Sequence, residues 1–305
     1  MWVSKRAAAV ESPPPSFHSS ASASLEPTAL VARSPPAWGD TTAFAIDFIR
    51  LTPLNLHMTG IHIHGPEPDL ENPTLVEGFP GVGLVGKIAT DHLVEQLQMR
   101  YYASVHCEGL PRIGVYRGGD RTVRPPVRLY VSEEQDLVAL QSDAPISSRA
   151  VETVATCLTN WIVDQAATPI YLSGLPADRD EADQPDLYGI TTGEGDERLE
   201  ATEVPIPPED GVITGPTGAL INRAAQENHD SIGLVVECDP QFPDPEAASV
   251  LLEDGVSPIA DIDVDVQDLV DRAAEIRAKR ERLAQQMQAI GREESSQAQP
   301  LRMYQ

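Results

Sequence analysis

Three glycines stand at the spacing that nucleotide-binding proteins use. Gly81, Gly83 and Gly86 spell G-x-G-x-x-G between an apolar strand-like segment and an amphipathic helix-like one. In a strand-to-helix turn of this kind, backbone N–H groups can approach the pyrophosphate of a dinucleotide. Glu108 closes the next expected strand, near the place where an acidic residue would bind the ribose. A nucleotide site is therefore one interpretation of this loop.

The residues around the glycines favour a second, structural interpretation. Phe79-Pro80 lies between the strand and Gly81, whereas a dinucleotide fold runs directly from strand to glycine. Lys87 follows Gly86 without the Ser or Thr of a phosphate-binding Walker loop. In the structural interpretation, Gly81 and Gly83 permit a tight turn and Gly86 lets the helix pack close to the sheet. The N-terminus of that helix could still hold an anion.

Other polar residues suggest chemistry only weakly. His62 and His64 are two apart on an expected strand and face one side, which we interpret as a solvated strand face because no third metal ligand is evident. Asp143, Asp239 and Asp244 follow or flank strands, where catalytic groups and ordinary turn residues both occur. No Ser-His-Asp order, G-x-S-x-G or H-E-x-x-H is present. We therefore predict a protein that is not an enzyme, with no catalytic residue, metal or cofactor.

The charge of the chain limits its partners. Its 305 residues include 22 basic and 47 acidic ones, a net charge of -25. Such a surface repels nucleic acid and anionic membranes, so neither is an expected partner. Only three of the basic residues are lysines, and many carboxylates with little lysine are typical of a halophilic protein, although an acidic protein with one basic partner would also fit.

The cysteines and the apolar segments indicate a cytoplasmic protein. Cys107, Cys157 and Cys238 are far apart and form no C-x-x-C, so we expect three small core residues in a reducing compartment, without a disulfide or zinc site. The chain has no run of eighteen apolar residues and no secretory h-region. We predict a cytoplasmic location with no membrane span.

The periodicity from Met58 onward predicts an α/β fold in which a mostly parallel or mixed central sheet is covered on both faces, a three-layer α/β/α sandwich. Expected strands are residues 60–65, 73–79, 101–107, 113–117, 127–132, 136–142, 168–175, 211–216 and 231–238. Expected helices are residues 84–98, 147–166 with Ser147 or Ser148 as N-cap, 217–228, 244–255 and 266–290. Residues 176–210 are an acidic excursion with a hairpin near 188–192.

Four parts are expected along the chain. Residues 1–57 are rich in Ser, Ala and Pro and carry no net charge, so they are predicted to be disordered, either as a genuine tail or because translation begins at Met58. Residues 58–262 form a single α/β domain. Residues 263–291 form a long C-terminal helix, which either packs on the domain or self-associates. Residues 292–305 form a flexible tail.

Three segments together resemble the archaeal branch of the proteasome assembly chaperone superfamily. They are EGFPGVGLVGK at 77–87, GVITGPTGALINRA at 211–224 and FPDPEAASVLLE at 242–253. The family-motif loop comprises Gly78, Phe79, Pro80, Gly81, Gly83, Gly86 and Lys87. The resemblance covers about residues 60–290 and implies a sandwich with some likeness to nucleoside phosphorylases. It also implies a homo-oligomer that escorts proteasome subunits and is not an enzyme.

The last three residues, Met303-Tyr304-Gln305, fit this resemblance. They match the hydrophobic–tyrosine–any signature by which proteasome activators and some assembly chaperones dock between α-subunits of the 20S proteasome. A terminal carboxylate can enter a basic pocket, and tyrosine is a rigid anchor with a polar tip. The main hypothesis is a chaperone or binding factor for the 20S proteasome. The alternatives are a nucleotide-binding or nucleoside phosphorylase-like enzyme that uses the Gly81–Gly86 loop, and an oligomeric scaffold with an incidental tail.

Overall fold

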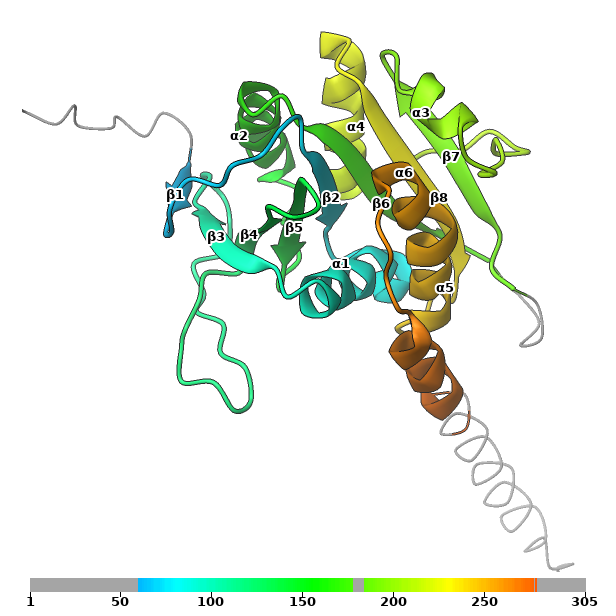
Figure 1. The fold of residues 1–305 in the computed structure, drawn as a ribbon, viewed down its shortest axis with the longest axis horizontal. Coiled ribbons are helices and arrows are strands. Elements are labelled where there is room, and N and C mark those ends of the chain that lie inside the picture. Colours follow the sequence, from blue (N-terminus) through cyan, green and yellow to red (C-terminus); the bar gives the residue numbers. More distant parts are fainter. Residues whose placement is uncertain (1–59, 178–183, 277, 279–305) are drawn as a thin grey trace, which may run out of the picture. The chain divides into compact units, whose positions relative to one another are not determined.

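One mixed sheet forms the centre of the protein in our computed structural model, which describes residues 60–177, 184–276 and 278 (Figure 1). Within these residues the strand order is β1-β3-β4-β5-β2-β6-β8-β7. Strands β5, β2, β6 and β8 run parallel, and β1, β3, β4 and β7 add antiparallel pairs at the two sides. The strands are β1 Ile61–Ile63, β2 Thr74–Gly78, β3 Arg100–Val105, β4 Val127–Ser132, β5 Leu137–Ser142, β6 Thr168–Pro176, β7 Leu187–Thr192 and β8 Ser231–Cys238.

Helices cover both faces of this sheet. On one face, α1 (Val85–Gln96) packs beside α5 (Pro245–Val250) and the π-helical turn Leu251–Val256. On the other face, α2 (Val151–Asp164) packs beside α4 (Gly215–Glu227). Because the central strands are covered on both faces, β4 and β5 are buried along their whole length, including the polar residues Arg128 and Gln141.

Each major helix buries one apolar stripe. In α2 the stripe is Val154, Leu158 and Ile162, at the spacing of an amphipathic helix. The short elements are the 3₁₀ turn Val82–Leu84, α3 (Asp196–Glu200) and α6 (Ser257–Ala260). The predicted mixed α/β sheet is confirmed, while the likeness to nucleoside phosphorylases stays a prediction.

Several local predictions are wrong. Residues 113–117 form no strand but lie in a long loop with one isolated bridge, Val115–Arg124. Residues 211–216 form no strand either, because α4 begins at Gly215 with a proline in its first turn, a favoured position for proline. Neither predicted serine caps α2, which starts at Val151 without a side-chain cap. Residues 188–192 belong to β7, which pairs with β8 instead of forming a local hairpin.

The predicted C-terminal helix is only partly within the described residues. Positions 267–276 are helical, and Leu269 and Ala273 are buried. The rest of the 266–290 prediction, the tail 292–305 and residues 1–57 lie outside the described residues. Their boundaries stay predictions.

Candidate functional site

The glycine motif lies at the carboxyl end of β2, where the chain turns into α1. Gly83 has a φ of +60°, and a Cβ atom there would lie 2.9 Å from the Cys238 sulfur. A Cβ atom on Gly86 would lie 3.2 Å from Leu172 of β6. These two glycines therefore serve the turn and the close packing of α1 on the sheet, as the structural interpretation predicts. Gly81 differs, because its φ is -132° and a Cβ atom would meet only a carbonyl oxygen at 4.0 Å.

The remaining residues of the family-motif loop are also engaged in the fold. A Cβ atom on Gly78 would lie 2.1 Å from the hydroxyl of Thr90 on α1, so only glycine fits. Phe79 is buried and Pro80 borders a cavity. The Lys87 ammonium donates hydrogen bonds at 2.8 Å to Asp91 and 2.9 Å to Asp143. Lys87 is thus held in ion pairs and not presented to a phosphate.

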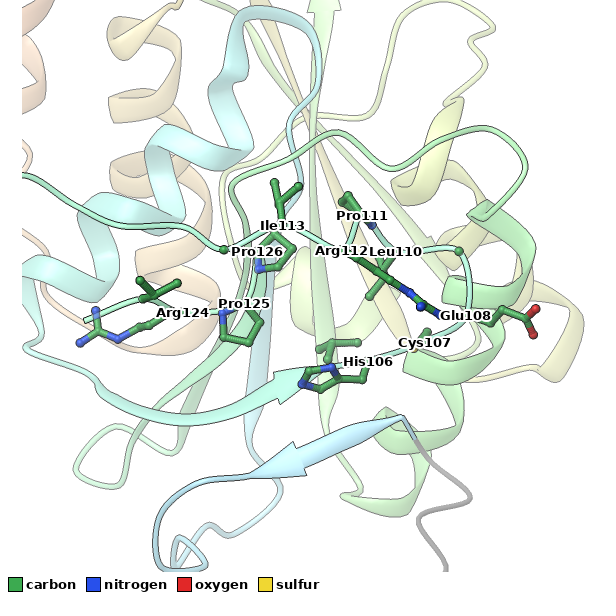
Figure 2. A pocket seen from close by; sticks show the side chains of 14 residues that line it. His106, Cys107, Glu108, Leu110, Pro111, Arg112, Ile113, Arg124, Pro125 and Pro126 are labelled. Carbon is green, nitrogen blue, oxygen red and sulfur yellow. The ribbon is translucent and has the colours of Figure 1, made fainter. Parts of the chain in front are cut away.

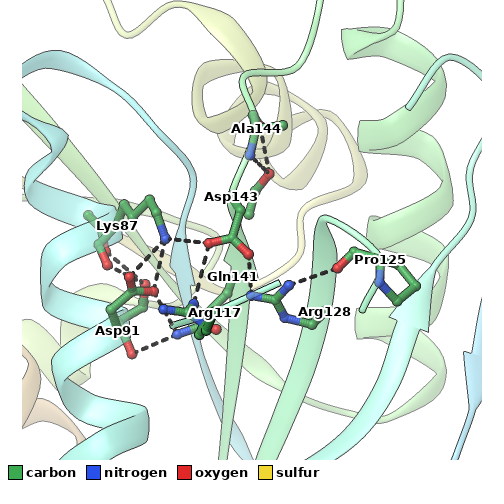
Figure 3. A network of polar contacts seen from close by, with 11 residues as sticks. Lys87, Asp91, Arg117, Pro125, Arg128, Gln141, Asp143 and Ala144 are labelled. Atoms are coloured by element: carbon green, nitrogen blue, oxygen red, sulfur yellow. Dashed lines mark hydrogen bonds and ion pairs between the residues drawn. The ribbon is translucent and has the colours of Figure 1, made fainter. Parts of the chain in front are cut away.

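Asp143 is the centre of a polar network at the carboxyl end of β5 (Figure 3). Its carboxylate accepts hydrogen bonds from Lys87, Arg128 and Arg117, and Arg128 is only 1% exposed. Burial opposes ionisation of Asp143, but the Lys87 hydrogen bond and the Arg128 charge outweigh it and lower the pKa. The position of Asp143 after a strand made it a weak catalytic candidate. In the structure it is instead the counter-ion of the buried Arg128.

Glu77, the first residue of the motif segment 77–87, is fully buried on β2. Its Oε1 accepts hydrogen bonds from the Phe79 N–H at 2.7 Å and from the Thr217 hydroxyl of α4 at 3.3 Å. Glu77 Oε2 has no hydrogen-bond partner among the described residues. Burial raises the pKa of Glu77 to about 8, against the smaller effect of those two hydrogen bonds. The side chain is therefore mostly protonated at neutral pH, and it joins the first motif segment to the second.

The third motif segment joins the same place. Asp244 donates its backbone N–H to the Gly83 carbonyl at 2.8 Å. Its side chain caps α5 by accepting from Ala247 N–H at 3.0 Å and also accepts from Asp239 N–H. The three segments that are far apart in the sequence thus meet at the carboxyl ends of β2, β6 and β8. We call this region the motif edge.

The motif edge contains a cavity of about 420 Å³ and several exposed apolar side chains. The cavity is bordered by residues 79–82, the end of β6 and residues 212–217. Leu84 has a φ of +51°, a strained conformation for leucine, and is 37% exposed. Exposed side chains at these segments are Val82, Leu84, Leu175, Val212 and Phe242. Val82 and Val212 border the same cavity, and exposed apolar groups that lie together are typical of protein-binding surfaces.

A second, larger cavity lies at the base of the loop between β3 and β4 (Figure 2). Its volume is about 820 Å³, and residues 105–114 and 123–126 line it. Cys107 at its edge forms a disulfide with Cys157 of α2, 50 residues further along the chain. The prediction that no cysteine forms a disulfide is wrong, because the fold brings together two residues that no short spacing links. Cys238 is a buried core residue, as predicted.

Three histidines, His62, His64 and His106, lie at β1 and the end of β3, near one end of the sheet. The rings of His62 and His106 pack in a tilted arrangement with centroids 4.4 Å apart, and His64 Nε2 lies 2.7 Å from the Ser104 hydroxyl. All three are exposed, in agreement with a solvated strand face. Partial burial and then its histidine neighbours lower the pKa of His106. No group of three or more His, Cys, Asp or Glu residues suited to a metal ion occurs among the described residues.

The predicted partner-binding residues Met303, Tyr304 and Gln305 lie outside the described residues. Sequence reasoning did not place Thr217 beside Glu77 or Asp244 beside Gly83. Their position within the motif segments was the available signal, but only the fold shows that the segments meet. No helix in the described ranges has both the length and the apolar character needed to cross a bilayer.

Fold and site define a mixed α/β protein in which three sequence motifs meet at the carboxyl ends of the central strands, beside a fully buried glutamate with a raised pKa. The PAC2 family profile matches residues 75–284, and the chain belongs to that family. Its resemblance to archaeal proteasome assembly chaperone homologues is thereby confirmed.

Individual relatives agree with this assignment. The chain is 29% identical over 221 residues to the uncharacterized protein MJ0106 of Methanocaldococcus jannaschii, covering 72% of this chain and 88% of that protein. The structure is similar to PbaA of Pyrococcus furiosus, an archaeal homolog of proteasome-assembly chaperone, with a TM-score of 0.66 and 27% identity over 78% of this chain and 98% of PbaA. PbaB of Pyrococcus furiosus, an archaeal proteasome activator, shares the fold, with a TM-score of 0.63 and 23% identity over 74% of this chain and all of PbaB.

Proposed function

We propose that this chain is a non-enzymatic assembly chaperone or binding factor of the 20S proteasome that acts in the cytoplasm as a homo-oligomer. The observation that carries the proposal is the family match over residues 75–284, together with 27% identity to PbaA over 78% of the chain. The motif edge adds physical support, because its exposed apolar side chains suit contact with another protein. An acidic chain of net charge -25 also suits a protein partner better than nucleic acid.

The proposed partner is the α-ring, and the proposed docking element is the tripeptide Met303-Tyr304-Gln305. Tyr304 supplies an aromatic anchor and a hydroxyl, and Met303 adds adaptable apolar contact. The terminal carboxylate supplies a charge that a basic pocket can bind. Several tails on one oligomer would bind together and so raise the effective concentration.

The glycine loop does not favour the alternative, a nucleotide-binding or nucleoside phosphorylase-like enzyme. Gly83 and Gly86 are occupied by the turn and by helix packing, and Lys87 is held by two carboxylates. In the proposal, the loop positions the motif edge and holds no cofactor. Calorimetric titration of the full chain with ATP and with NAD tests this point, since we expect no binding at micromolar concentrations.

The test of the proposed function is a pull-down of 20S α-subunits in molar salt with the full chain and with a chain that ends at Arg302. We expect the full chain to retain α-subunits and the truncated chain to lose most of them. A chain with Gln305→Asn is the matched control and should bind as the wild type does. Equal retention by the full and truncated chains would remove the tail from the mechanism, and failure of both would remove the proteasome as partner.

A further inference from the structure

A basic loop extends from an otherwise acidic protein. We define the basic loop as residues 106–126, which connect β3 to β4 and reach away from the sheet (Figure 1). It contains four arginines against two carboxylates, a net charge of +2 in a chain of net charge -25. Arg112 and Arg121 are exposed and form no ion pair with any described residue. The loop therefore presents cationic groups that its own domain does not neutralise.

The same loop also exposes large apolar side chains. Tyr116 is 78% exposed, Val123 is 63% exposed and Ile113 is 50% exposed. Tyrosine and arginine are enriched in protein interfaces, because each combines a broad apolar surface with hydrogen-bonding groups. A loop with this composition is suited to a partner surface that is both acidic and partly apolar.

The base of the basic loop is fastened to the domain on both sides. On one side, the Cys107–Cys157 disulfide ties it to α2. On the other side, the Arg128 guanidinium donates to the Pro125 carbonyl at 2.8 Å, and the Asp143 N–H donates to the Pro126 carbonyl at 2.9 Å. Backbone hydrogen bonds between Val115 and Arg124 close its middle. Less conformational entropy is lost on binding when a loop is held in this way.

The opposite edge of the sheet has the complementary character. Residues 184–210, which include β7 and α3, carry eight carboxylates and one arginine, a net charge of -7. Beside β7 lies a concave surface of about 470 Å³, which we call the acidic pocket. No carboxylate that lines it forms an ion pair with a described residue. Its exposed carboxylates are Asp186, Glu203, Glu253 and Asp254, and its apolar wall includes Val204 and Val250.

We propose that the basic loop of one copy of this chain docks in the acidic pocket of a second copy. The chain itself supplies both halves of the contact, a cationic loop with exposed aromatic and aliphatic groups and an acidic pocket with an apolar wall. Strands β5, β2, β6 and β8 separate β4 from β7, so the two surfaces are at opposite ends of the sheet. At about 4.8 Å per strand this is a separation of roughly 25 Å, and each surface faces a different neighbour.

The contact is head-to-tail, because different surfaces of the two copies meet. Repetition of such a contact closes a ring when the rotation between copies allows it. This inference rests on the homo-oligomer of the proposed function and names the surfaces that would form it. A ring would carry several C-terminal tails together. In high salt the exposed apolar groups supply most of the attraction, and the arginines mainly determine which surface is recognised.

Charge exchange between the two surfaces is the decisive test. Sedimentation velocity of the full chain at one fixed salt concentration measures the oligomer. We expect wild type to sediment as an oligomer, and both Arg112→Glu/Arg121→Glu and Glu203→Lys/Glu253→Lys to shift the midpoint concentration of association about tenfold or more upward. Arg272→Glu, at another exposed arginine, is the control and should behave as wild type. Circular dichroism and the melting temperature establish that each variant is folded.

Mixing the two reversed variants separates docking from general electrostatics. The acidic loop of one variant then faces the basic pocket of the other, while their remaining surfaces stay complementary, so association should return. A monomeric wild type, or reversals that leave the oligomer unchanged, would overturn the proposal. Pull-down of 20S α-subunits with the same variants distinguishes it from the proposed function. If loop reversal abolishes proteasome binding but leaves the oligomer intact, the loop contacts the proteasome instead of a second copy.

Discussion

Replacing Glu77 by glutamine should stabilise the folded protein at neutral pH. Glu77 is fully buried, and burial raises its pKa from 4.5 to about 8. Between these values the folded protein binds a proton that the unfolded chain has released. The free energy of unfolding therefore falls by about 1.4 kcal/mol for each pH unit over this window. By pH 7 the wild type has lost roughly 3 kcal/mol from this group, and a neutral side chain avoids the loss.

Glutamine is a suitable replacement because its carbonyl oxygen can accept the same hydrogen bonds from Phe79 and Thr217. Urea unfolding of both proteins at pH 5, 6, 7 and 8, at constant salt, measures the difference in free energy. We expect the advantage of Glu77→Gln to be small at pH 5 and to grow up to about pH 8. Glu134→Gln, in the exposed turn between β4 and β5, is the control and should match wild type throughout. A difference that stays constant with pH would refute the argument.

Three further substitutions test other parts of the structure by thermal and chemical unfolding. Gly83→Ala should cost about 1 kcal/mol or more without affecting any nucleotide affinity, because the position has positive φ and no room for a methyl group; a neutral effect would contradict the turn geometry. Asp143→Asn should cost about 3 kcal/mol, since it leaves the buried Arg128 without its counter-ion. If Lys87→Met lowers stability as much, Asp143 is not the centre of this polar network. Cys157→Ser should lower stability by up to about 4 kcal/mol, the value expected for a closed loop of about 50 residues; identical unfolding of wild type with and without reductant would argue against the bond to Cys107.

The sheet could be predicted from sequence where local pattern and tertiary environment agree. The largely apolar segments at 127–132, 136–142 and 231–238 became β4, β5 and β8, because strands covered on both faces bury most of their side chains. The glycine motif was assigned correctly to a strand-to-helix turn, because an apolar strand precedes it and a helical pattern follows it. Phe79-Pro80 before the first glycine and the missing Ser or Thr after Lys87 already argued against phosphate binding, and the structure shows Phe79 buried and Lys87 in ion pairs.

The errors arose where apolar residues are exposed on the protein surface instead of being buried in the core. Ile113 and Val115 alternate like a strand, yet they lie in the basic loop, where Ile113 is exposed and Val115 forms only an isolated bridge. Residues 211–216 also look like a strand, but positions 212–216 border the cavity of the motif edge, and Val212 is 88% exposed there. The disulfide and the meeting of the three motif segments depend on contacts between residues distant in the chain. Periodicity carries no information about such contacts.

The most direct test of the proposed proteasome partnership is the affinity of Tyr304→Ala for purified α-rings and whole 20S particles. Interferometry in molar salt, with wild type and Gln305→Asn as controls, measures this affinity. If the tail docks between α-subunits, Tyr304→Ala should weaken binding by about 2 kcal/mol, roughly thirtyfold, per engaged tail. One extra residue after Gln305 should weaken binding similarly, because it displaces the terminal carboxylate, while Gln305→Asn should have little effect. Equal binding by wild type, Tyr304→Ala and the extended chain would contradict tail docking.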